Sequence, residues 1–173
     1  MREKSDVGRA MGGDRAAFAR LYERYGRPVF LDLVARLRVR EDAEDALQLT
    51  FLSAWSALPR LRHPERFVGW LFRIGRNKAR DLGRRERLRW MRPLVEEDLI
   101  APTGTEAPEV ERLKGLVAGL KTQTRSILLL RAVEGWSADE VATALGCSAA
   151  TVRRKYARAL GRLRAGLVPR SAG

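Results

Sequence analysis

Two groups of cationic side chains are the residues in this sequence with the clearest capacity to bind a ligand. Residues 151–173 contain seven Lys or Arg and no acid, and residues 73–92 contain nine Lys or Arg and two acids. Guanidinium and ammonium groups bind phosphates, and one arginine can also contact the O6 and N7 atoms of a guanine together. The two groups therefore predict two separate contacts with nucleic acid, in preference to an ordinary solvated surface.

The C-terminal group follows the pattern of a helix-turn-helix. A capping box from Ser137 to Glu140 begins one helix, Gly146 ends it, and Ser148 caps the next. The second helix of such a motif enters the DNA major groove, whereas a purely structural hairpin does not require arginines on its exposed face. Its candidate DNA-binding residues are Thr151, Arg153, Arg154, Lys155 and Arg158. Lys155 is expected at a backbone phosphate, and Thr151 also fits a structural place in the first helical turn.

The cationic group of residues 73–92 lies on a helix that is apolar at its beginning and basic towards its end. Phe67, Trp70, Leu71 and Ile74 form an apolar stripe that predicts a buried beginning. The candidate DNA-binding residues of this helix are Arg73, Arg76, Asn77, Arg80, Arg84 and Arg85. An amide such as Asn77 can hydrogen-bond a base, and arginines can hold the phosphates of an opened strand.

Three further helices are predicted before this one. Asp14 caps the first, which ends at Gly26, and the second begins near Pro28 and packs antiparallel to the first. Asp42 caps the third helix, whose first turn is rich in acids.

Residues 93–109 separate these helices from the C-terminal group. The stretch 93–111 has six acids and no base, and it contains prolines and a glycine that disfavour regular structure. Nothing in the chain shows the alternating pattern of strands. The prediction is an all-α fold of two small helical domains, 1–92 and 110–173, joined by a flexible acidic linker, 93–109, with the helix-turn-helix in the second domain.

Composition excludes several classes of protein. The chain has 173 residues and a net charge of +13, with one cysteine, Cys147, and one histidine, His63. These numbers exclude an internal disulfide and a Cys/His zinc cluster, and no nucleophile and base pair or phosphate-binding glycine loop is present. The sequence shows no signal peptide or membrane-spanning run, so a cytoplasmic, non-enzymatic protein without cofactor or metal is expected.

Motifs in both halves, in the right order, resemble the extracytoplasmic-function (ECF) group of bacterial RNA polymerase sigma factors, of the sigma-70 family. The N-terminal motifs are Ala17 and Phe18 with Leu21, Tyr22 and Tyr25, then residues 42–48, 50–52, 54–55 and 67–74, with Arg76, Asn77 and Asp81. The C-terminal motifs are residues 128–131, 134–137, 140–142, 145–146, 148 and 151–153. They are similar to regions two and four of the family, respectively.

This resemblance implies a protein that binds core RNA polymerase, directs it to promoter DNA and assists melting. Region two would serve the polymerase and the proximal promoter element, and region four the distal element. Asp45 and Gln48 match the family's polymerase-binding segment, and Leu49 stands where the family usually has Glu, so an apolar contact is expected there. Many members are restrained by an anti-sigma factor, which the resemblance admits here, with no membrane insertion of the chain itself.

Two other functions remain open at the level of the residues. An autonomous helix-turn-helix regulator would use the C-terminal helices alone and leave the arginines of 73–92 unexplained. A nuclease or nucleotidyl transferase would need clustered carboxylates for paired metal ions, and no such cluster is evident.

Overall fold

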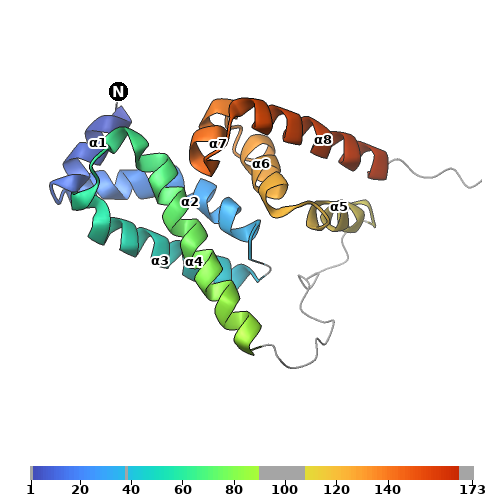
Figure 1. Ribbon diagram of the computed structural model, residues 1–173, viewed down its shortest axis with the longest axis horizontal. Helices are drawn as coiled ribbons and strands as arrows, with labels where there is room; N and C mark the ends of the chain where they lie inside the picture. Colours follow the sequence, from blue (N-terminus) through green and yellow to red (C-terminus); the bar gives the residue numbers. More distant parts are fainter. Residues whose placement is uncertain (1, 38, 90–107, 168–173) are drawn as a thin grey trace, which may run out of the picture.

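The computed structural model describes residues 2–37, 39–89 and 108–167, and every regular element within these ranges is helical, which confirms the all-α prediction (Figure 1). The elements are α1 (Arg2–Met11), α2 (Arg15–Val34), α3 (Arg40–Ala57), η1 (Leu58–Arg60), η2 (Pro64–Arg66), α4 (Phe67–Arg89), α5 (Pro108–Ala118), α6 (Thr122–Ala132), α7 (Ala138–Leu145) and α8 (Ala149–Leu167). We call α1–α4 with η1 and η2 the N-terminal bundle, and α5–α8 the C-terminal bundle. Residues 93–107 of the expected linker lie outside the described residues.

The first helix, α1, is an element that the sequence reasoning missed. Its buried residues Val7 and Ala10 are three positions apart, which is the spacing of one helical face, and α1 packs against α2. A stripe of so few apolar residues gives a weak signal in a segment whose other residues, apart from Met11, are polar or glycine.

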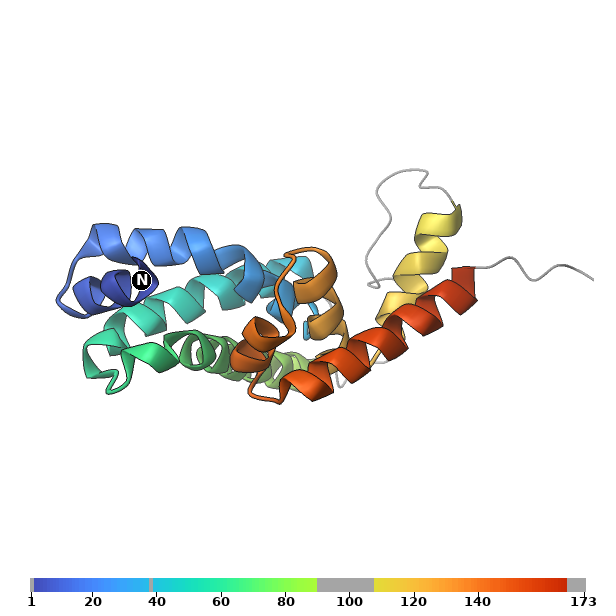
Figure 2. The same cartoon turned by 90° about the horizontal axis from the view of Figure 1, so that it is seen from above.

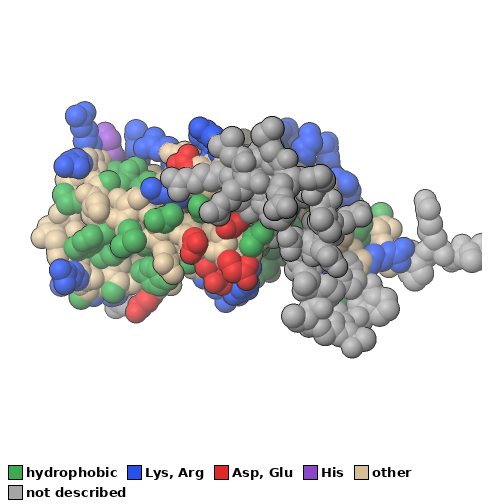
Figure 3. Space-filling view, turned by 90° about the horizontal axis from the view of Figure 1, so that it is seen from below, with side chains coloured by type: hydrophobic (Ala, Val, Ile, Leu, Met, Phe, Trp, Pro, Cys, Tyr) green, Lys and Arg blue, Asp and Glu red, His purple; other side chains and the backbone are tan. Residues whose placement is uncertain are grey.

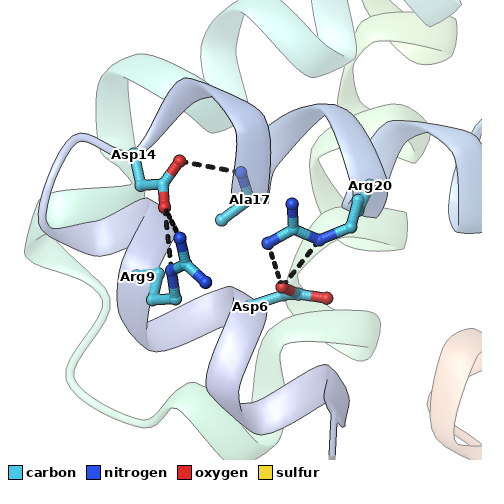
Figure 4. Close-up of polar contacts among 5 residues, drawn as sticks. All are labelled: Asp6, Arg9, Asp14, Ala17 and Arg20. Carbon is cyan, nitrogen blue, oxygen red and sulfur yellow. Dashed lines mark hydrogen bonds and ion pairs between the residues drawn. The ribbon is translucent and has the colours of Figure 1, made fainter.

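The connection from α1 to α2 is held by three polar contacts (Figure 4). Asp14 accepts a hydrogen bond from the Ala17 backbone N–H at 3.0 Å, so the predicted cap of this helix is confirmed. Asp14 also pairs with Arg9 at 2.7 Å, and Asp6 pairs with Arg20 at 2.6 Å. The Ala17 N–H lowers the pKa of Asp14, and the hydrogen bond from Arg20 lowers the pKa of Asp6.

The predicted break between Gly26 and Pro28 is wrong, because α2 runs without interruption through both residues. Proline removes one backbone donor from the helix and strains its preceding turn. The continuous helix keeps a single apolar face buried on both sides of that point, and this burial outweighs the lost hydrogen bond. The buried residues of this face are Leu21, Tyr25, Val29 and Leu33.

The third helix packs along α4 and begins three residues before the position predicted from its cap. Val39 occupies the N-cap without a side-chain hydrogen bond, so the prediction that Asp42 caps α3 is wrong. Asp42 lies instead in the first turn, where a negative charge is favourable beside the helix dipole. Phe51 of α3 and Phe67 and Leu71 of α4 are all buried in the N-terminal bundle.

The C-terminal bundle contains the predicted helix-turn-helix. Ser137 and Glu140 form the capping box of α7, and Gly146 ends that helix in the left-handed conformation at φ 67°. Ser148 caps α8 by accepting a hydrogen bond from the Thr151 N–H at 3.2 Å. These three features were predicted from sequence and are confirmed.

The two bundles are packed against each other. Helices α6 and α7 lie beside α2 and α4, while α5 and the far end of α8 extend away from the N-terminal bundle (Figures 1 and 2). Ile127, Leu130 and Val141 belong to the same buried apolar cluster as the N-terminal core. A smaller cluster, built around Leu120 and Leu163, joins α5, α6 and α8.

Candidate nucleic-acid and protein interfaces

Helix α8 presents its arginines to solvent. Its inward side is fixed by Val152 and Ala159, which are buried, whereas Arg153, Arg154 and Arg158 are exposed. An exposed basic face on the second helix of a helix-turn-helix is the arrangement that reads DNA in the major groove.

Two other predicted residues of α8 have partners within the chain. Lys155 donates a hydrogen bond to the side-chain oxygen of Gln123 on α6, and the Ser148 hydroxyl donates to the Thr151 hydroxyl at 3.0 Å. Thr151 is half-buried beside its cap, so its geometry is that of a first-turn structural residue.

Arg131 of α6 holds the helix-turn-helix in place, and sequence reasoning did not identify that role. Its guanidinium donates a hydrogen bond to the Trp136 carbonyl at 2.5 Å and lies 5.2 Å from the centroid of the Tyr156 ring on α8. One cation therefore joins α6, the turn before α7, and the inner face of α8. A basic residue at the end of an apolar run was the only available signal.

Helix α4 presents a second row of basic and polar side chains. Arg73, Asn77, Arg80 and Arg84 are exposed, and their spacing of three to four residues places them on neighbouring positions of the helix surface. The side chain of Arg85, also predicted here, lies outside the described part of the structure.

Arg76 differs from its neighbours on α4 because it is half-buried and already bound. Its guanidinium donates a hydrogen bond to the Ala144 carbonyl of α7 at 2.9 Å. Burial lowers the pKa of Arg76, the nearby Asp32 carboxylate acts in the opposite direction, and the neighbouring arginines Arg36, Arg73 and Arg80 lower it further.

Helix α3 carries the predicted polymerase-binding residues on its outer face. Asp45 and Gln48 are exposed, and Leu49 is 41% exposed. Leu52 is 65% exposed and was missed, although its place four residues after Gln48 puts it on the same face. Viewed from below, this side of the molecule shows hydrophobic side chains next to a group of acids (Figure 3).

The aromatic residues of the N-terminal bundle are engaged with one another. Phe72 is fully buried. The ring centroid of Trp55 is 4.9 Å from that of Phe18, and Trp70 is 5.9 Å from Phe67. These contacts place the two half-buried tryptophans at the edge of the core.

The histidine lies just before η2, and the cysteine lies in the turn between α7 and α8. His63 Nδ1 lies 3.0 Å from the Glu65 carboxylate on the surface, and Cys147 is a half-buried free thiol. Among the residues that the structure describes, no group of three or more His, Cys, Asp or Glu side chains could hold a metal ion. The described helices also include none with both the length and the hydrophobicity to cross a lipid bilayer.

An all-helical chain with an arginine-bearing recognition helix and a second basic helix belongs to the class of DNA-binding transcription proteins. Comparison with known families gives a more particular answer. The model of sigma-70 region 2 matches residues 21–89, and that of sigma-70 region 4 matches residues 111–163.

Two curated relatives match about nine tenths of the chain. RNA polymerase sigma factor NccH of Alcaligenes xylosoxydans xylosoxydans is 33% identical over 167 residues, covering 91% of this chain and 90% of its own. RNA polymerase sigma factor CnrH of Cupriavidus metallidurans is 34% identical over 172 residues, covering 90% and 89%, respectively. The solved structure of CnrH in complex with the cytosolic domain of CnrY has a TM-score of 0.70 at 31% identity and covers 99% of this chain and all of that one.

The chain therefore belongs to the sigma-70 family of RNA polymerase sigma factors, in its ECF group. It is not an enzyme: it binds core RNA polymerase, directs it to promoters and assists DNA melting. The autonomous regulator, which the residues alone left open, is not favoured by these relatives.

Proposed function

We propose that this sigma factor divides its contacts between its two bundles. Residues 1–92 form the domain for core polymerase and the proximal promoter element, residues 93–109 connect, and residues 110–173 form the domain for the distal element. The observation that supports this division most directly is the capped helix α8 with Arg153, Arg154 and Arg158 exposed together. An arginine row of this kind can combine base contacts with phosphate contacts.

The polymerase contact is assigned to the outer face of α3. Asp45 and Gln48 offer polar groups, and Leu49 with Leu52 offers apolar area beside them. Exposed leucines that adjoin charged residues are typical of a protein interface.

The proximal promoter element is assigned to α4 and to the loop before it. Arg73, Asn77, Arg80 and Arg84 face solvent along one helix, and Arg60, Arg62 and Arg66 are exposed in the segment from η1 to η2. Holding an opened strand requires phosphate contacts and capture of unstacked bases, which these side chains can supply together with Arg76 once it is released.

A further protein partner is proposed from the relative CnrH, whose structure holds the cytosolic domain of a second protein, CnrY. We infer that this chain acts in the cytoplasm and is restrained there by an anti-sigma factor. Such a partner and core polymerase should compete for the chain, and simultaneous stable binding of both would contradict the inference.

The experiment that tests this assignment is transcription by core RNA polymerase, with and without the protein, on a pool of promoter fragments. Initiation that depends on the protein and enriches a two-part motif is expected. Substitutions in α8 should alter only the distal part of the motif, and substitutions in α4 only the proximal part. Selection of a single palindrome by the protein alone would contradict the proposal.

A further inference from the structure

Helix α8 is held by two apolar clusters, one near its beginning and one along its second half. Val152 belongs to the large cluster that includes residues of α7, whereas Ala159 and Leu163 belong to the smaller cluster with α5 and α6. Tyr156 lies between them and packs at the edge of both clusters. Tyr156 is therefore the point at which the first turns of α8, which bear the arginines assigned to DNA, are joined to the rest of the helix.

A cation lies over the Tyr156 ring. The Arg131 guanidinium, from the last turn of α6, is 5.2 Å from the centroid of that ring and donates a hydrogen bond to the Trp136 carbonyl at 2.5 Å. A guanidinium is planar and has five N–H donors, so it can lie on a ring and hydrogen-bond a carbonyl at the same time. A lysine ammonium is a point charge on a flexible stem and has no such planar fork. Arg131 thus links the turn before α7 to α8 through two contacts of one side chain.

The side chains of that turn are engaged on the other side, with the N-terminal bundle. The ring centroids of Trp136 and of Phe72 on α4 are 5.7 Å apart, and Glu134 forms an ion pair with Arg27 of α2 at 2.7 Å. The backbone carbonyl of Trp136, and not its ring, is therefore the group through which this turn meets Arg131.

We propose that Arg131 is a positioning residue for the distal promoter element: it sets the angle at which the first turns of α8 enter the major groove, without touching DNA itself. Arg131 is half-buried on the inner side of α8, whereas Arg153 and Arg154 are exposed. A bidentate contact between an arginine and a guanine depends on the direction of the helix that carries it, because both hydrogen bonds must be aligned. This inference rests on the role proposed above for α8.

The first measurement is the selection of the distal element by the polymerase holoenzyme, using transcription from a library randomised in that element. The readout is the ratio of initiation on the preferred element to initiation on the other sequences. Arg131→Met keeps the length of the side chain but removes its charge and its donors. It should lower this ratio about tenfold, as the loss of one base contact would. An unchanged ratio in a folded Arg131→Met protein would overturn the proposal.

Three further variants keep the test informative if Arg131→Met does not fold. Arg131→Lys retains a cation without the planar fork and should lower the ratio about threefold. Tyr156→Leu removes the ring and should lower the ratio about tenfold. Tyr156→Phe is its matched control, which retains the ring and should behave like the parent protein. Parent-like ratios for both Arg131→Lys and Tyr156→Leu would overturn the proposal.

The ratio separates positioning from a purely structural role. A substitution that only destabilises the C-terminal bundle reduces the amount of active protein, so it lowers initiation on every distal sequence alike and leaves the ratio unchanged. That result for Arg131→Met would overturn the proposal. Selection of the proximal element, measured in the same reactions, should stay as in the parent protein.

Arg131 and Tyr156 should act through one shared contact. Effects of residues in direct contact are not additive, so Arg131→Met combined with Tyr156→Leu should lower the ratio by no more than about tenfold. Independent effects would multiply to a loss of about a hundredfold and would overturn the coupling between the two residues.

Salt dependence separates positioning from a direct phosphate contact. The affinity of the holoenzyme for the preferred promoter is measured over a series of potassium chloride concentrations, and loss of one phosphate contact lowers the logarithmic slope by about one. Arg131→Met should leave this slope unchanged, whereas Lys155→Ala, which is expected at a phosphate, should lower it. A lower slope for Arg131→Met would overturn the positioning role.

The assignment of α8 to the distal element is judged separately, by the double variant Arg153→Ala with Arg154→Ala. An unchanged ratio for this variant would overturn the role proposed for α8 and this inference with it. A ratio that falls for the double variant but not for Arg131→Met would overturn only the inference about Arg131.

Discussion

Ser137 and Glu140 exchange two hydrogen bonds across the first turn of α7. The Ser137 backbone N–H donates to Glu140 Oε2 at 2.8 Å, and the Glu140 backbone N–H donates to Ser137 Oγ at 3.2 Å. This reciprocal cap satisfies donors that the helix itself cannot satisfy. It also fixes the direction in which α7 leaves the turn.

Ser137→Ala should therefore lower the free energy of unfolding by about 1 kcal/mol. Urea denaturation followed by circular dichroism measures this change. Thr143→Ala, at an exposed position of the same helix, is the control and should change stability far less. Equal losses from both substitutions would show that the cap has no special role.

The same cap predicts a dependence on pH. The Ser137 N–H lowers the pKa of Glu140 below its ordinary value of 4.5. A carboxyl whose pKa is lower in the folded protein contributes stability that is fully present above about pH 4.5 and is lost as the pH falls through the folded value. Glu140→Gln should flatten this part of the stability profile, and a profile that remains as steep as the parent's would contradict the prediction.

Asp32 gives the N-terminal bundle a buried charge that is hydrogen-bonded by Arg36. It is 2% exposed and accepts two hydrogen bonds, each 2.9 Å long, from Arg36 one turn later. Arg36→Ala leaves this carboxylate without that partner and should lower the free energy of unfolding by about 3 kcal/mol. Arg40→Ala removes a similar pair with Glu44, but both groups are exposed, so a loss of only about 0.3–0.5 kcal/mol is expected. Comparable losses in chemical denaturation would disprove the distinction.

The arginines of α8 should differ in what they recognise. If Arg153 or Arg154 contacts a base, its replacement by Ala weakens binding to the preferred distal element by about 1–3 kcal/mol. The same change relaxes the sequence preference at one base position. Lys155→Ala, which removes a side chain bound to Gln123, should weaken binding to all DNA sequences equally. Transcription from a library randomised in the distal element measures both effects. An equal loss on every sequence for all three variants would assign only phosphate roles.

Asp45 should contribute to polymerase binding through its exposed charge. Asp45→Arg is expected to reduce affinity for core polymerase by about tenfold without changing the melting temperature. Glu65→Arg, an exposed acid of the same bundle outside α3, serves as the control for charge. If fluorescence titration with core polymerase gave the same affinity for both variants, Asp45 would have no special role.

Local patterns predicted α7 and the start of α8 well, because each of these boundaries has its own chemical signal. Ser137, Gly146 and Ser148 act on backbone groups within a few residues of themselves, so the structure of α7 and α8 can be inferred without tertiary information. The error at Gly26 and Pro28 has the opposite origin, since tertiary burial of one side of α2 overrides two residues that locally favour a break.

The exposure of a candidate site residue could be predicted from sequence where it follows from helical periodicity alone. Arg153, Arg154 and Asp45 are exposed as that periodicity requires. The special position of Arg76 could not be predicted in this way, because its partner carbonyl is 68 residues further along the chain. Neither Trp136 nor Glu134 carries a pattern that indicates which helix of the other bundle it meets.

The apolar cluster that runs through both bundles also connects folding with activity. Since Ile127 and Val141 are buried together with Phe67 and Leu71, unfolding of either bundle exposes surface of the other. The chain should melt in one cooperative transition, whereas a variant whose bundles no longer pack together should melt in two steps at lower temperature. A substitution that raises the melting temperature by tightening this junction should therefore also resist any movement of one bundle relative to the other.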